Sequence, residues 1–227
     1  MRRLAFGPDS DFVRHMGIYI ATMSLDIPID HVRDVVMHNT PGLAVAIHPS
    51  RGRALAFFAL RSPAIPDFDY RDSQQHKRLL AAAFAESSWL LPQLLDRVHA
   101  ADDLYFDSVS QVRLSTWSRG RVALLGDAAS RVSLFGDGSS LAMAGAFTLA
   151  DELATNPGDH QLAFRRYEAR HRTQVDPRQR FGVALGAALI VPATRRGILA
   201  RNLTTRLWPV GAAAGWLGRR LTPRRRR

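Results

Sequence analysis

The residues best suited to chemistry follow a short apolar run at positions 121–125. Gly126 ends that run, and a residue without a side chain lets a ligand approach the backbone closely. Asp127 then offers a carboxylate and is followed by Ala128. We expect the run to be a strand buried on both faces. Asp127 would then lie at its carboxyl end, where open α/β sheets bind their ligands.

A glycine-bearing segment comes next along the chain. It contains Gly136, Asp137 and Gly138, and Ser139 and Ser140 then open a helical pattern that continues to about residue 154. The free N–H groups and the dipole at a helix start favour an anionic or electron-rich ligand. A carboxylate beside such a helix start suits a ligand with hydroxyl groups and a negatively polarised edge. A flavin nucleotide has both.

The same residues also have a purely structural interpretation. Asp127 can cap a turn, residues 136–138 can form a tight turn, and Ser139 can be the N-cap of the helix. Short motifs arise easily by chance, so spacing alone favours this structural interpretation.

The order of the motifs resembles the second flavin-binding motif of class A flavoprotein monooxygenases, the family of para-hydroxybenzoate hydroxylase. Members carry a strand, Gly-Asp-Ala-Ala, a loop, Gly-x-Gly, and a helix with Leu-Ala and Ala-x-x-Leu-Ala. Here these motifs occupy residues 126–129, 136–138, 141–142 and 146–150. The resemblance implies FAD contacts for Gly126, Asp127, Ala128, Gly136, Asp137, Gly138, Ser139 and Ser140. Within that set, Asp127 would meet the ribityl and pyrophosphate region, and residues 136–139 the pyrimidine edge of the ring.

The resemblance implies hydroxylation of a small organic substrate. NADH or NADPH reduces FAD, O₂ forms a flavin hydroperoxide, and one oxygen atom passes to the substrate. Because the flavin carries this chemistry, no catalytic side chain is assigned. The loop departs from the family, since Ser130 stands where histidine is frequent, residues 131–135 contain no proline, and Asp137 replaces the usual glutamine or glutamate.

The family's first flavin motif does not occur in this sequence. Residues 1–120 contain no Gly-x-Gly-x-x-Gly fingerprint, which in the family places the pyrophosphate of FAD at a helix start. We therefore expect a truncated or split member, with a separately encoded N-terminal flavin-binding half as a partner. Such a chain would have weak or no FAD binding and activity alone. A decayed pseudoenzyme without a ligand is a further alternative.

The surrounding sequence predicts an α/β fold with a mixed sheet. β-branched and aromatic residues with alternating polarity predict strands at 13–25 and 105–114. Two apolar runs, 43–48 and 54–60, flank a turn and predict a hairpin. Helices are predicted at 71–84, 90–98 and 159–175.

The expected domain organisation has three parts. A substrate-domain portion covers residues 1–118, and the C-terminal part of a Rossmann-like FAD-binding domain covers 119–178. Helices and an arginine-rich tail then cover 179–227, after Pro177 has interrupted the preceding helix.

The net charge of +11 raises the question of an anionic partner. Lys77 is the only lysine among 31 basic residues, which indicates a compositional preference for arginine rather than selection for phosphate contacts, so we expect no nucleic-acid partner. Arginines gather in residues 195–227 together with Trp208 and Trp216. A non-enzymatic interaction or membrane-surface protein that uses this segment is therefore the alternative to the enzyme. The absence of cysteine and of an export signal favours the cytoplasm. The eight histidines are scattered, which predicts no metal site.

Overall fold

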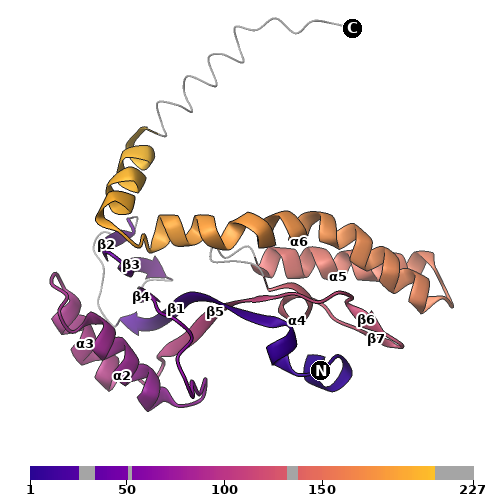
Figure 1. Cartoon of the computed structure of the whole chain (residues 1–227), viewed down its shortest axis with the longest axis horizontal. Helices are drawn as coiled ribbons and strands as arrows, with labels where there is room; N and C mark the ends of the chain where they lie inside the picture. The colour runs from indigo at the N-terminus through magenta and orange to yellow at the C-terminus, as the bar shows by residue number, and fades with distance from the viewer. Residues whose placement is uncertain (26–33, 51–52, 132–137, 208–227) are drawn as a thin grey trace, which may run out of the picture.

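The computed structural model describes residues 1–25, 34–50, 53–131 and 138–207 (Figure 1). The predicted site residues Gly136 and Asp137 and the end of the chain beyond residue 207 lie outside the described residues. In chain order the elements are α1 (Arg2–Ala5), the 3-10 helix η1 (Asp9–Asp11), β1 (Val13–Leu25), β2 (Val36–Thr40), β3 (Leu43–Ser50), β4 (Arg53–Arg61), α2 (Ser73–Phe84), α3 (Leu91–Ala100), β5 (Tyr105–Val112), β6 (Ser118–Arg119), β7 (Val122–Ala123), α4 (Asp127–Ser130), α5 (Gly138–Thr155) and α6 (His160–Ile190).

Five strands form one sheet in the order β2-β3-β4-β1-β5. The predicted hairpin is formed by β3 and β4, with Ser50 opposite Arg53. The α/β fold is confirmed, but every pairing in this sheet is antiparallel, so no parallel pair of the expected mixed sheet occurs among the described strands. A parallel pair would need a crossover connection of a dozen or more residues between the two strands.

The alternating pattern of β1 divides the sheet into two faces. Tyr19, Ala21 and Met23 face α2 and α3, where Leu80 and Leu94 belong to the same buried cluster. Figure 1 shows these two helices together on one side of the sheet, with α6 on the other. The amphipathic patterns that predicted β1, α2 and α3 therefore reflect one shared core.

The opposite face of the sheet packs against the end of α6. Ile18 and Ala59 contact a buried cluster that includes Ala187 and Val191. The Arg61 Nε donates a hydrogen bond to the Val191 carbonyl over 2.7 Å. The sheet and the long helix thus meet in a packed contact rather than through a linker.

The run at 121–125 is not the doubly buried strand that the sequence predicted. Only Val122–Ala123 is a strand, and it pairs antiparallel with Ser118–Arg119 in a separate two-stranded ribbon. Val122 and Ala123 are half-buried, and Leu124 N already bonds to the Trp117 carbonyl at 2.8 Å. A strand buried on both faces lies between neighbouring strands and under helices on both faces, whereas β6 is the one strand paired with β7 among the described residues.

Pro177 does not end its helix, contrary to the prediction. α6 continues through Pro177 to Ile190. Proline removes one backbone donor from a helix interior, which packing on both sides can outweigh. Val175 is fully buried before the proline, and Gln179 is tied to β5 after it, since Gln179 Nε2 donates to the Val112 carbonyl at 2.7 Å. Tertiary contacts on either side of the proline therefore hold the helix together.

A further helix follows a break at residues 191–194 and occupies 195–207, which confirms the predicted helical tail. The break is fixed to the sheet, because Gly42 N donates to the Pro192 carbonyl at 2.8 Å. The proposed domain boundaries fall within elements: residue 118 lies in β6, and residues 178 and 179 lie in α6. The three-part division stays a prediction.

The Gln179 contact predicts a measurable effect on stability. Replacing Gln179→Ala leaves the buried Val112 carbonyl without its donor, and a buried unsatisfied group costs about 1–3 kcal/mol. We expect the free energy of unfolding in urea to fall by that amount. Gln174→Ala, an exposed glutamine on the same helix, is the matched control and should change little. Equal losses in the two variants would contradict a stabilising role for the hydrogen bond between Gln179 and the Val112 carbonyl.

Candidate cofactor site

The site begins with a backbone turn at Gly126 that only glycine fits. Its φ of 59° lies in the left-handed region, and a Cβ added there would lie 3.2 Å from the Cβ of Ala142 in α5. The Gly126 carbonyl accepts hydrogen bonds from Ala129 N at 3.0 Å and Ser130 N at 2.9 Å. The turn therefore brings the start of α4 into close contact with α5.

Asp127 is the first residue of α4 and presents its carboxylate to solvent, with 69% of the side chain exposed. A Cβ added to Gly138 would lie 3.8 Å from Asp127 Oδ1, so the carboxylate sits beside the start of α5. The first N–H groups of a helix have no acceptor within the helix. The structure thus brings together the two parts of the predicted site, a carboxylate and a helix start, although residues 132–137 between them are not described.

The other predicted residues group around these two. Ala128 is half-buried beside Asp127, and Ser139 and Ser140 are exposed in the first turn of α5. The N-cap of α4 is Gly126, which has no side chain to accept a cap hydrogen bond. The ligand role and the turn-cap role of Asp127 both stay predictions.

Arg131 is a site residue that the sequence analysis missed. Its Nη2 donates to Asp107 Oδ2 at 2.6 Å and its Nη1 to Ser110 Oγ at 3.2 Å, both on β5, while its Nε lies 4.0 Å from Asp127 Oδ2. Burial disfavours the charged guanidinium, but the hydrogen bond and charge of Asp107 outweigh it and raise the pKa of Arg131. The i,i+4 spacing from Asp127 was a signal for Arg131. No comparable signal pointed to Asp107.

The same carboxylate also affects a tyrosine at the start of β5. Tyr105 OH donates to Asp107 Oδ2 at 3.1 Å. Burial and then the negative charge of Asp107 raise the pKa of Tyr105. Asp107 therefore holds both Arg131 and Tyr105, and it links α4 to the sheet.

An open hollow of about 270 Å³ lies at the motif. Arg2, Ser110, Asp127 and Arg131 line it with polar groups, alongside Val13, Val112 and Ala128. Arg2 is held in place by an ion pair of 2.7 Å with Asp9 and donates to the Ala128 carbonyl at 3.2 Å. Two guanidinium groups thus line the same hollow as the exposed Asp127 carboxylate.

α6 contacts both the segment that leads to Gly126 and α5. Tyr167 OH donates to the Leu124 carbonyl at 3.2 Å, and burial together with the charge of Glu168 raises the pKa of Tyr167 to about 12. His171 stacks on Tyr167 with ring centroids 5.9 Å apart. A Cβ added to Gly145 of α5 would lie 2.9 Å from His171 Nε2, so glycine allows the two helices to approach. This contact fixes where the motif lies.

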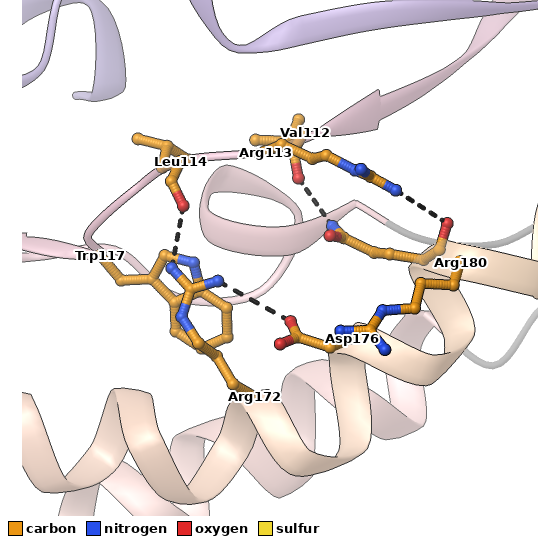
Figure 2. A pocket seen from close by; sticks show the side chains of 8 residues that line it. Val112, Arg113, Leu114, Trp117, Arg172, Asp176 and Arg180 are labelled. Atoms are coloured by element: carbon orange, nitrogen blue, oxygen red, sulfur yellow. Dashed lines mark hydrogen bonds and ion pairs between the residues drawn. The ribbon is translucent and has the colours of Figure 1, made fainter.

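A second pocket, of about 210 Å³, lies between β5 and α6 (Figure 2). Arg172 lies across Trp117 at 4.6 Å from the ring centre, and it donates to the Leu114 carbonyl at 2.9 Å and to Glu168 at 2.7 Å. Figure 2 shows Arg172 directed between Leu114 and Asp176. Because these polar groups already bind one another, we assign this pocket a structural role.

Metal binding finds no support in the described part of the chain. No group of three or more His, Asp or Glu residues there is placed to hold an ion. None of the helices described is long and apolar enough to cross a bilayer.

No family model matches the chain, but individual relatives do. A flavin-dependent monooxygenase of Legionella longbeachae is 33% identical over 194 residues, which is 84% of this chain and 50% of the relative. An uncharacterized protein of Mycobacterium tuberculosis is 36% identical over 186 residues, 79% of this chain and 49% of that protein. Among solved structures, tetracycline destructase Tet(55) matches with a TM-score of 0.73 and 33% identity, over 88% of this chain and 54% of its own. By sequence and fold, this chain is homologous to the flavin-dependent monooxygenases.

This homology confirms the family recognised from the Gly126–Asp127 motif. The chain spans about half the length of the curated relatives it matches, and it corresponds to the C-terminal part of these monooxygenases. HpxO of Klebsiella pneumoniae, solved with FAD and uric acid, has a TM-score of 0.64 at 23% identity, and that likeness shows the fold alone.

The buried His171 predicts a pH dependence of stability. Burial, and then the positive charge of Arg178, lowers the pKa of His171 from its ordinary 6.5. The unfolded chain then takes up the proton more readily, so this residue makes the protein less stable as pH falls below about 6.5. The free energy of unfolding in urea should fall less between pH 7 and pH 5 in His171→Phe than in the unaltered protein. The matched control His99→Phe, at an exposed histidine, should lose as much stability between these pH values as the unaltered protein. If His171→Phe also loses as much as the unaltered protein, the prediction is wrong.

Proposed function

We propose that this chain is the C-terminal part of an FAD-dependent monooxygenase that hydroxylates a small organic substrate with NAD(P)H and O₂. The observation that carries the proposal is the Gly126 turn, which sets the exposed carboxylate of Asp127 beside the start of α5. The homology to flavin-dependent monooxygenases supports it. Its expected compartment is the cytoplasm, where NAD(P)H is available.

The residues present fit a flavin nucleotide. Gly126 lets the start of α4 pack against Ala142 of α5, and Gly138 lies beside the Asp127 carboxylate without a side chain of its own. In the proposal the Asp127 carboxylate accepts hydrogen bonds from the hydroxyl-bearing ribityl chain of FAD. The start of α5, with Gly138 and Ser139, lies against the electron-rich edge of the ring. FAD supplies the redox chemistry when bound, and the protein orients the reactants and excludes water.

The substrate would lie on the sheet face opposite α2 and α3. Thr22 of β1 and Phe57 of β4 lie opposite one another on that face and are half-buried, and Phe57 also packs against the cluster at the end of α6. The similar tetracycline destructase Tet(55) is named for tetracycline, which is a polar ring compound. We therefore propose a polar ring compound as the substrate class.

Exchanges at Asp127 test the site in a protein that includes the first flavin motif. Hydrogen bonds to charged groups contribute about 1.5–3 kcal/mol, so Asp127→Ala should lower FAD affinity roughly tenfold to a hundredfold. Asp127→Asn keeps one acceptor oxygen and should lose less. Flavin titration measures both effects, and Asp102→Ala, an exposed aspartate after α3, is the matched control.

Melting of the cofactor-free variants distinguishes the two interpretations of Asp127. A ligand group should leave the melting temperature nearly unchanged. A lower melting temperature with unchanged FAD affinity would instead establish Asp127 as a structural residue and remove it from the site.

We also propose that the first flavin motif comes from a segment outside this sequence, and that this segment packs on α5. Met143 and Phe147 are 67% and 70% exposed on that helix, and Leu153 is 40% exposed. The other side of α5 packs on α6, where Leu141 and Gly145 are buried. A helix that is apolar on both sides is normally buried on both.

Co-expression tests this packing. The N-terminal half of the Legionella longbeachae relative should co-purify with this chain and give a complex that binds FAD, whereas the chain alone should bind FAD weakly or not at all. Met143→Ser with Phe147→Ser should weaken the complex at least tenfold, because about 1.5–3 kcal/mol is lost per large apolar side chain that stays unburied. Leu199→Ser, an equally exposed apolar residue on another helix, is the control. Stoichiometric FAD on the isolated chain would contradict the requirement for a second half.

A further inference from the structure

The net positive charge of this protein comes from its C-terminal quarter. After Asp176 the sequence contains no acidic residue and 12 arginines. The chain up to Asp176 has 19 basic residues, the difference between 31 and 12, and all 20 acidic ones, which gives a net charge of −1. The part of the chain up to Asp176 and the C-terminal segment therefore differ in net charge, and the C-terminal segment is the part suited to an anionic partner.

The helix at 195–207 has a defined orientation because Arg201 ties it to the body. Arg201 Nη1 donates to Asn39 Oδ1 at 2.8 Å and to the Leu189 carbonyl at 3.0 Å. Leu199 and Leu203 are each two positions from Arg201, which is about 200° around a helix, so they lie on the side away from the body. In Figure 1 this yellow helix projects from the rest of the molecule, far from α4 and the N-terminus.

The outward side of this helix carries a stripe of leucines. Leu199, Leu203 and Leu207 follow one another at intervals of four residues and are 68%, 59% and 55% exposed. Arg195, Arg196 and Arg206 on the same helix are exposed as well. An apolar stripe accompanied by arginines, with no acidic residue, is the pattern of a helix that lies in the interface of a bilayer.

We propose that helix 195–207 docks this protein on an anionic lipid surface. Lipid headgroups complement the arginines, and the acyl boundary accepts the leucines. A nucleic acid would satisfy the arginines but offers no apolar medium for the leucine stripe. A second copy of the chain would bring the same positive charge to the same place. Lipid is thus the occupant that matches both features, and it leaves the candidate cofactor site uncovered.

Co-sedimentation with vesicles tests the proposal on the full chain. Vesicles of phosphatidylcholine with phosphatidylserine should bind the protein, and added salt should weaken the binding. The triple exchange of Leu199, Leu203 and Leu207 to Ser should reduce binding at least tenfold, because the apolar contribution is lost. The exposed Met143 and Phe147 of α5, exchanged to Ser, provide the matched control and should bind like the unaltered chain.

Further outcomes decide against the proposal. It is overturned if the unaltered chain does not co-sediment with these vesicles, or if it binds equally well to vesicles that lack phosphatidylserine. It is also overturned if the leucine variant binds normally while a chain ending at residue 207 does not, since residues 208–227 would then be the anchor. Circular dichroism and melting of the leucine variant should match the unaltered chain, because all three leucines are exposed. Binding of the segment that packs on α5 is measured separately, so either proposal can fail alone.

Discussion

The backbone between the end of β5 and the start of α4 forms few ladder hydrogen bonds, and its carbonyl groups need other partners. One helix supplies them. From α6, Gln179 donates to the Val112 carbonyl, Arg172 to that of Leu114, and Tyr167 to that of Leu124. Because these three side chains lie on one helix, they fix the backbone position of the irregular segment between β5 and α4. The position of the Gly126 turn, and with it the candidate site, depends on this satisfaction of carbonyls by α6.

The sequence predicted those parts of the fold in which local pattern and tertiary packing agree. β1 and the β3–β4 hairpin alternate because one face meets α2 and α3, and alternation is visible in a sequence. The run at 121–125 misled because continuous apolar residues do not reveal how many strands lie beside them. Pro177 misled because the contacts that preserve α6 come from residues distant in sequence.

The candidate site was predictable to the same degree. Gly126 and Asp127 form a local motif, and the structure places them beside Gly138, as expected. The link between Arg131 and Asp107 joins the residue after α4 to a strand residue 24 positions earlier, and no spacing rule indicates such a pair. Local motifs thus predicted which groups lie together, whereas the side chains that hold them in place became visible only in three dimensions.

The Gly126 turn also has an entropic consequence. Its carbonyl binds two N–H groups of α4 and its Cα packs on α5, so the backbone that carries Asp127 is already immobile before any ligand arrives. Only the two side-chain torsions of an exposed carboxylate remain to be ordered when a hydroxyl group approaches. Freezing few rotamers leaves more of the hydrogen-bond energy available as affinity. If Asp127 binds the flavin as proposed, a short aspartate on this hydrogen-bonded turn is preorganised, whereas a longer side chain on a freer loop would lose more conformational freedom on binding.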